Sequence, residues 1–278
     1  MIALLATVIA PTIVLFRGET DLTPPEPLPL GGYTARQGKV AEPGGDTLKA
    51  RSIILHVGMM RIAFVSVEML TVPESLFTAV KSKLPDIDLL FISATHTHCA
   101  PDSQMLNERM NFAIPGIASF KREWMNWYAD RISRSVLGAK RWSQPDTVWT
   151  EERRLTANRG RRASAEPDTM ATSVVAFKDQ AYPMFFHYAA HATVFGADEL
   201  KTRSDWPGLV QFRGLTLIGP IGDVSPNVEG ETAATKLEDM RRKLTARVPY
   251  IQTTVYPAYK AGIGYATANI DLAAPVPH

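Results

Sequence analysis

The sequence has a single cysteine, Cys99, so no intrachain disulfide bond is possible and cysteine usage points to no particular compartment. Its formal net charge is only +2, which predicts no binding to nucleic acid. The short basic cluster Arg159-Gly160-Arg161-Arg162 is typical of a solvated loop. A lone cysteine is usually a small buried apolar residue, so Cys99 is interpreted as a packing residue.

Several common catalytic and nucleotide-binding motifs are missing. The sequence contains no P-loop, no G-x-G-x-x-G, no H-E-x-x-H, no C-x-x-C and no G-x-S-x-G. Their absence excludes the common nucleotide-binding, thermolysin-like and α/β-hydrolase classes. A search for function therefore has to start from other polar clusters.

The apolar N-terminal segment, residues 1–17, is short for a membrane span. It has no charged residue up to Phe16, but a span needs roughly 20 apolar residues, and a basic n-region and cleavage signature are lacking. We favour a strand at 12–16 and leave 1–11 open between an atypical export signal and a short anchor. Export would make the protein secreted, periplasmic or membrane-associated; otherwise it would be cytoplasmic.

Apolar periodicity predicts one domain over residues 18–278 with a layered α/β fold. The expected strands are 50–57, 61–67, 88–93, 147–156, 172–177, 182–188, 215–218, 250–256 and 266–272, and the expected helices are 73–84, 124–137 and 229–247. Because a strand, a helix and a strand follow one another over 61–93, we expect a crossover unit. The fold class is therefore a mixed β-sheet with flanking helices.

Two histidine clusters follow predicted strands, where α/β proteins commonly bind ligands. The run Ser93-Ala94-Thr95-His96-Thr97-His98 comes after one strand. In extended chain, His96 and His98 would point to opposite faces, so one could bind a metal while the other faces substrate. After another strand, His191 is interpreted as a ligand and His187 as structural.

Two polar turns also follow apolar runs. They are Thr202–Gly208, which contains Asp205, and Gly222–Asn227, which contains Ser225. Asp, Ser and Asn at such turns most often cap the backbone. On this basis alone, a structural role is favoured over a functional one for both turns.

Taken in order, these motifs resemble the N-terminal catalytic domain of neutral/alkaline ceramidases. Ser93–His98 matches the family's S-A-T-H-T-H letter for letter, and Gly222–Asn227 matches its G-D-V-S-P-N. The remaining similar segments are Asp21-Leu22-Thr23-Pro24-Pro25, Leu30-Gly31-Gly32-Tyr33, Asp46–Arg51, Asn158-Arg159, His191-Ala192-Thr193 and Ser204–Gly208. The resemblance spans residues 21–227.

The resemblance implies a ceramidase-like fold and a zinc-dependent amidohydrolase that cleaves the N-acyl bond of ceramide or a similar lipid-like amide. It implies that His96 and His191 bind zinc. It gives His98 an oxyanion-stabilising or proton-transfer role, places Arg159 near the substrate and gives Ser225 a positioning role near the metal site. Asp205 joins this catalytic set as an expectation. No protein partner is predicted, and contact with a membrane surface would suit such a substrate.

The sequence departs from the family pattern towards its C-terminus. We find no match for the downstream motifs that carry the family's other zinc ligands, a Glu and a Tyr, and catalytic zinc normally has three protein ligands. Residues that could supply a third ligand are Asp205, Asp223, Glu229, Tyr256, Tyr259 and Tyr265. The alternatives are a non-catalytic metal-binding relative or a fragment of the fold and, less favoured, a metal-free hydrolase using Ser225 or Cys99.

Overall fold

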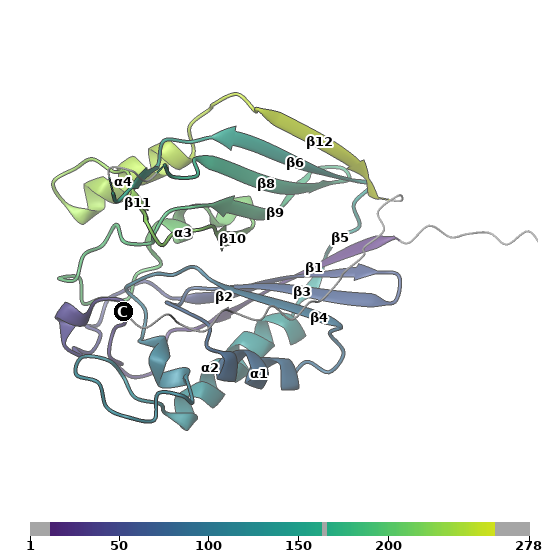
Figure 1. The fold of residues 1–278 in the computed structure, drawn as a ribbon. Coiled ribbons are helices and arrows are strands. Elements are labelled where there is room, and N and C mark those ends of the chain that lie inside the picture. The colour runs from purple at the N-terminus through teal and green to yellow at the C-terminus, as the bar shows by residue number, and fades with distance from the viewer. Residues whose placement is uncertain (1–11, 163–165, 259–278) are drawn as a thin grey trace, which may run out of the picture.

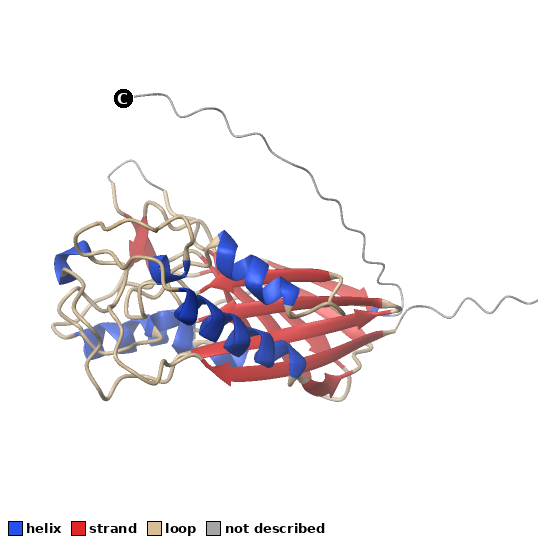
Figure 2. Ribbon diagram, turned by 90° about the horizontal axis from the view of Figure 1, so that it is seen from below, coloured by secondary structure: helices blue, strands red, loops and turns tan. Residues whose placement is uncertain are grey.

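The computed structural model describes residues 12–162 and 166–258. Two five-stranded sheets lie one above the other, with helices α1 and α2 below the lower sheet (Figure 1). Seen from below, the helices cross the strands, and the loops gather at one end of the sheets (Figure 2). The layered α/β fold with mixed sheets and flanking helices is thus confirmed.

The first sheet has the strand order β4-β3-β2-β1-β5. Strands β1, β2 and β3 pair antiparallel, and β4 joins parallel to β3. That parallel pair, connected through α1, is the crossover unit that the sequence predicts. The bounds are β1 Ile13–Asp21, β2 Lys49–Val57, β3 Met60–Val67, β4 Leu89–Ala94 and β5 Lys140–Ser143.

Helices α1 (Glu74–Ser82) and α2 (Arg122–Leu137) cover the outer face of this sheet. Their apolar stripes, such as Leu76 on α1 and Ile132 on α2, are fully buried against β2 and β3 in the first core cluster. Burial of these stripes supplies the main stabilisation of both helices, since short helices are marginal in isolation.

The second sheet has the order β10-β9-β8-β6-β12, in which only β9 and β10 pair parallel. One face packs on the first sheet through residues such as Leu15 and Met184. Helices α3 and α4 contribute Trp206 and Met240 to a second hydrophobic cluster, which they form with residues of this sheet. The bounds are β6 Thr147–Arg154, β8 Met170–Phe177, β9 Ala181–Tyr188, β10 Leu215–Ile218, β12 Gln252–Pro257, α3 Asp205–Leu209 and α4 Ala233–Leu244.

A separate two-stranded ribbon pairs β7 (Asn158–Gly160) with β11 (Val224–Pro226). The sequence did not predict β5, β7 or β11, because three or four residues carry too little periodicity. Three short 3-10 helices complete the described elements: Thr34–Arg36, Ser103–Leu106 and Gln211–Arg213.

Two predicted elements differ from the structure by more than two residues at an end. Helix α4 starts only at Ala233, since Thr232 and Thr235 form a reciprocal capping box there. Strand β1 continues past Phe16 to Asp21, with every residue paired to β2. Residues 1–11, the predicted strand 266–272, Tyr259 and Tyr265 lie outside the described residues. No helix among the described residues is both long and apolar enough to span a membrane.

Candidate metal centre

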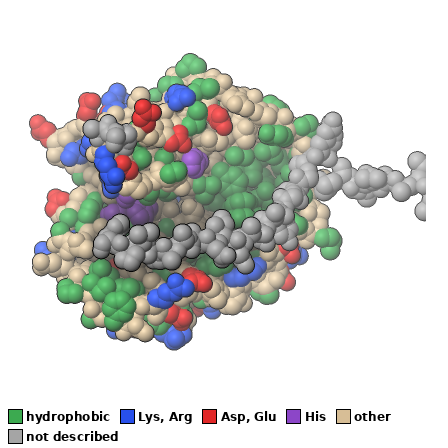
Figure 3. All heavy atoms as spheres, viewed as in Figure 1, with side chains coloured by type: hydrophobic (Ala, Val, Ile, Leu, Met, Phe, Trp, Pro, Cys, Tyr) green, Lys and Arg blue, Asp and Glu red, His purple; other side chains and the backbone are tan. Residues whose placement is uncertain are grey.

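Three histidines converge where the loops after β4 and β9 meet. His96, His98 and His191 each offer a ring nitrogen, and these three atoms lie within 4.8 Å of one another. The ring centroids are 4.8 Å (His96–His191), 5.0 Å (His96–His98) and 5.4 Å (His98–His191) apart. Histidine side chains gather in the hollow at this end of the molecule (Figure 3). No other such group occurs in the described ranges.

The prediction that His96 and His98 point to opposite faces was wrong. Strand β4 ends at Ala94, and His96 has φ 60, in the left-handed region, so the chain has left the extended conformation. The chain then bridges to the other loop: Thr97 pairs with Ala192, and the His98 N–H donates to the Ala192 carbonyl at 3.4 Å. Both rings therefore face the same centre.

The loop that carries His191 is fixed by two of the polar turns. The His191 N–H donates to the Val224 carbonyl at 3.3 Å, within the G-D-V-S-P-N turn. On the other side, the buried Trp206 indole N–H donates to the His191 carbonyl at 3.2 Å. Motifs that are far apart in the sequence thus support one ligand loop.

Hydrogen bonds define which ring nitrogens of His96 and His191 are free. The Nδ1 of His96 lies 2.8 Å from the Leu70 carbonyl, and the Nδ1 of His191 lies 2.7 Å from the Ile221 carbonyl. A carbonyl only accepts, so each Nδ1 carries the hydrogen. The neutral rings then present bare Nε2 atoms, which lie 3.2 Å apart. Backbone carbonyls orient metal-binding histidines in this way.

His98 adds a third nitrogen. Both of its ring nitrogens are buried and have no hydrogen-bond partner among the described residues. Burial lowers the pKa of all three histidines, that of His98 to about 3, so the rings are neutral, as metal binding requires. Buried polar atoms are rarely left unpaired, and a cation would satisfy them. The donor set fits a three-histidine zinc site.

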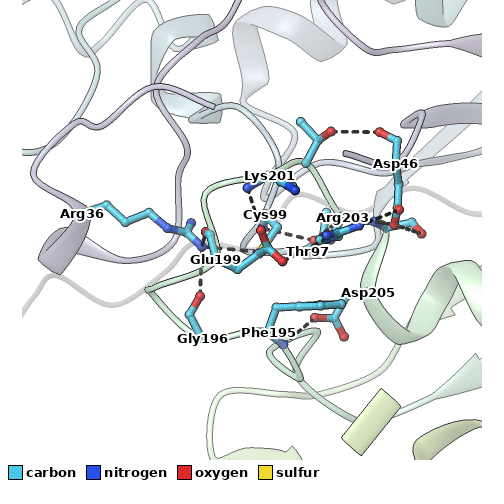
Figure 4. Close-up of polar contacts among 12 residues, drawn as sticks. Arg36, Asp46, Thr97, Cys99, Phe195, Gly196, Glu199, Lys201, Arg203 and Asp205 are labelled. Atoms are coloured by element: carbon cyan, nitrogen blue, oxygen red, sulfur yellow. Dashed lines mark hydrogen bonds and ion pairs between the residues drawn. The ribbon is translucent and has the colours of Figure 1, made fainter. Parts of the chain in front are cut away.

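Arg36 holds together the backbone of the two loops that carry the centre, and Figure 4 shows its side chain beside Gly196 and Glu199. It is 2% exposed, and it donates to the carbonyls of both converging loops. Its acceptors are the carbonyls of Gly31, His98, Gly196, Ala197 and Glu199, together with the Cys99 Sγ. This role was not predictable from the sequence, since arginine is rarely buried.

Gly32 and Tyr33 hold the His98 ring in place. Gly32 has φ +86, and a Cβ there would lie 2.5 Å from the His98 ring. Tyr33 packs edge-on against the same ring, with centroids 4.8 Å apart, and donates its hydroxyl to the Phe195 carbonyl at 2.9 Å. The glycine-rich turn is therefore needed for close approach.

Asp205 lies outside the histidine group. It is 2% exposed, and its carboxylate accepts backbone N–H groups from Val194, Phe195 and Trp206. Burial raises its pKa to about 7. These contacts brace the loop that follows His191, and the assignment of Asp205 to the catalytic set stays a prediction.

The other candidate residues fall into distinct places. Ser225 accepts a hydrogen bond from the Arg161 Nε at 2.8 Å, and Arg159 lies opposite Ser225 on β7. His187, on β9, lies against Gly219 rather than in the centre.

Among the described carboxylates proposed as third ligands, neither Asp205 nor Asp223 nor Glu229 belongs to the histidine group. Asp223 instead pairs with Arg162 at 3.6 Å. Burial raises the pKa of the Cys99 thiol to about 11, so the thiol is protonated near neutral pH. That state suits a packing residue better than a nucleophile.

Comparison with models of protein families and with curated proteins finds no match. Solved structures do match. A neutral ceramidase from Pseudomonas aeruginosa superposes with a TM-score of 0.69 at 16% identity, over 84% of this chain and 44% of that one. A ceramidase complexed with C2 gives the same TM-score and identity, over 84% and 43%. The chain thus spans less than half the length of these structures, and its fold is ceramidase-like, as its motifs predict.

Proposed function

We propose that this protein is a zinc-dependent amidohydrolase that cleaves the N-acyl bond of ceramide or a similar lipid-like amide. The observation that carries the proposal is the convergence of His96, His98 and His191 with two bare Nε2 atoms 3.2 Å apart. The fold is ceramidase-like, and both matched structures are named as ceramidases. This similarity supports amide hydrolysis as the reaction class.

The three imidazoles would hold the metal and keep it reactive. Zinc in such a site polarises an amide carbonyl and lowers the pKa of a coordinated water to about 7. Three neutral ligands leave the full positive charge at the centre, which favours a carbonyl oxygen. His98 thus takes a ligand role in place of the oxyanion or proton-transfer role implied by the family resemblance.

A cavity beside the centre supports a lipid-like acyl group, because its mixed lining includes the aliphatic side chains of Leu30, Leu70 and Ile117. Its volume is about 200 Å³, and its lining includes Leu70 and Gly32, which contact His96 and His98, together with Ile117. Beyond Ile117, the loop exposes Phe112 (54%) and Ile114 (36%). Ile114 pairs with the lining residue Ile117, and exposed apolar side chains near the cavity suit substrate taken from a membrane surface.

The test is hydrolysis of a fluorescent short-chain ceramide by the zinc-loaded protein. We expect fatty acid release that stops on chelation and returns with zinc, and no release by the His96→Ala, His191→Ala variant. His56→Ala is the matched control, because it removes an imidazole from β2 outside the centre. Absence of turnover on N-acyl amides by a zinc-loaded, folded protein would reject the hydrolase.

A second candidate is a non-catalytic metal-binding relative. The observation in its favour is that the described histidine group contains no carboxylate beside the three imidazoles. It predicts zinc bound by the same three histidines without turnover on any acyl amide. The chelation and hydrolysis measurements therefore separate the two candidates.

A further inference from the structure

Two arginines flank Ser225 on the β7–β11 ribbon. Arg159 is directly opposite Ser225 in the antiparallel register, and directly opposed side chains share a face. Arg161 follows β7, is tied by its N–H to the Asp223 carbonyl at 2.9 Å, and donates its Nε to the Ser225 hydroxyl at 2.8 Å. The ribbon therefore presents two guanidinium groups around one hydroxyl.

The ribbon is bonded directly to the metal centre. The Val224 carbonyl, beside Ser225, accepts the His191 N–H, and the Ile221 carbonyl accepts its Nδ1–H. Arg161 is bonded to Asp223 and Ser225 within the same turn. Its guanidinium group therefore lies beside the turn that fixes His191.

The charge of these arginines is not neutralised within the described part of the chain. Neither Arg159 nor Arg161 has a carboxylate within 4.0 Å there, whereas their neighbour Arg162 pairs with Asp223. Arg161 uses only its Nε, towards Ser225. Its two terminal nitrogens remain for a ligand, and they form the fork that matches a carboxylate.

We infer that Arg161, positioned by Ser225 and accompanied by Arg159, forms a carboxylate subsite that selects N-acyl amino acids as substrates. The inference rests on the proposed function, because the metal centre must take the amide carbonyl. The cavity adjoins His96 and His98, while Arg161 flanks the Gly222–Asn227 turn, whose Val224 carbonyl accepts the His191 N–H. An acyl chain in the cavity therefore leaves the amine side, with its carboxylate, towards Arg161.

The reaction is a simple hydrolysis. The oxygen of water bonds to the acyl carbon, the carbon–nitrogen bond breaks, and the nitrogen takes up a proton. The products are a fatty acid and a free amino acid, and no oxidant or reductant is needed. A substrate whose amine part carries no carboxylate would bind without contacting the terminal nitrogens of Arg161.

The test is isothermal titration of the zinc-loaded protein with N-octanoylglycine and with the neutral N-octanoylethanolamine. We expect the anionic probe to bind about 10-fold to 100-fold more tightly, the range for a charge-assisted hydrogen-bonded pair. Arg161→Met should abolish this preference and Arg161→Lys should keep only part of it. The matched control is Arg154→Met, on β6, where the exposed guanidinium contacts Thr169.

Equal binding of the two probes by the wild type, or a preference that survives Arg161→Met, would overturn the carboxylate subsite. Zinc content and circular dichroism of each variant verify that the centre and fold persist. Cleavage of both probes is measured separately. Tight binding of the anionic probe without cleavage would reject the hydrolase and keep the carboxylate subsite. Cleavage of both probes without tighter binding of the anionic one would reject the subsite and keep the hydrolase.

Discussion

The Nε2 atoms of His96 and His191 lie 3.2 Å apart, and neither can donate a hydrogen bond to the other. Their hydrogens are on Nδ1, where the carbonyls of Leu70 and Ile221 accept them. Two facing lone pairs repel each other unless a cation lies between them. The same centre includes the unpartnered ring of His98. The arrangement is therefore organised for a metal ion by contacts that do not involve the metal.

The first prediction concerns metal and stability. Because only the folded chain brings the three rings together, zinc at 1,000 times its dissociation constant should stabilise the fold by about 4 kcal/mol. Chelation should lower the melting temperature in calorimetry, and zinc should restore it. The His96→Ala, His191→Ala variant should not respond, while His56→Ala should. A melting temperature that chelation leaves unchanged in all three proteins would contradict this prediction.

The second prediction concerns the close approach of Gly32 to His98. In Gly32→Ala, the new Cβ would meet the ring at 2.5 Å, so the ring must move. Displacing an oriented ligand should weaken zinc affinity about 10-fold to 100-fold. Competition with a chromogenic chelator measures that affinity.

Gly44→Ala is the matched control, because Gly44 has φ +80 and open space around the Cβ position. It imposes similar backbone strain without touching the centre, and its zinc affinity should stay at the wild-type value. Equal losses in the two variants would attribute the effect to strain rather than to His98.

Much of the fold was predictable from local pattern. Long strands such as β3 and helices such as α2 follow from apolar periodicity, and the parallel β3–β4 pair follows from their order. The contribution of His98 was not predictable, because it depends on the left-handed conformation of His96. Residues other than glycine seldom adopt that conformation, and here it is held by contacts between loops about 100 residues apart.

The roles of Arg36 and Arg161 were also not predictable from local sequence pattern. In the sequence, Arg36 stands in an ordinary polar turn, and Arg161 belongs to a cluster interpreted as a solvated loop. Arg36 is buried only because carbonyls from two converging loops surround it. Arg161 did have one signal, its place two residues after Arg159, but the ribbon that directs it is too short to predict.

The third prediction concerns Asp205 and pH. Its pKa in the folded protein is about 7, above its ordinary value of 3.8. Between these values the folded chain holds a proton that the unfolded chain has lost, so stability falls as pH rises from about 4 to 7. Asp205→Asn cannot ionise and should lose this slope.

Urea denaturation at pH 5 and pH 8 measures the effect. The wild type should lose about 3 kcal/mol more than Asp205→Asn across this range. The variant should also be less stable at pH 5, by about 1–3 kcal/mol, because its NH₂ group cannot accept the N–H groups that the carboxyl group accepts. Identical slopes in both proteins would show that Asp205 does not titrate there.

The fourth prediction concerns the Arg36 clamp. Arg36→Met leaves several buried carbonyls without donors, and the loss should be about 3 kcal/mol or more in urea denaturation. Zinc affinity should fall as well, since one of those carbonyls belongs to His98. Arg241→Met, which removes an exposed arginine paired with Glu238 on α4, should change either quantity little. Comparable losses in both variants would rule out a specific clamp.

The most direct test of the three-histidine centre is the zinc content of the folded protein after equilibrium dialysis, measured by inductively coupled plasma mass spectrometry. The account predicts one zinc per chain in the wild type and in His56→Ala. It predicts a large loss in His98→Ala and essentially none bound in the His96→Ala, His191→Ala variant. A folded wild-type protein that retains no zinc, or a double variant that retains as much as the wild type, would contradict it.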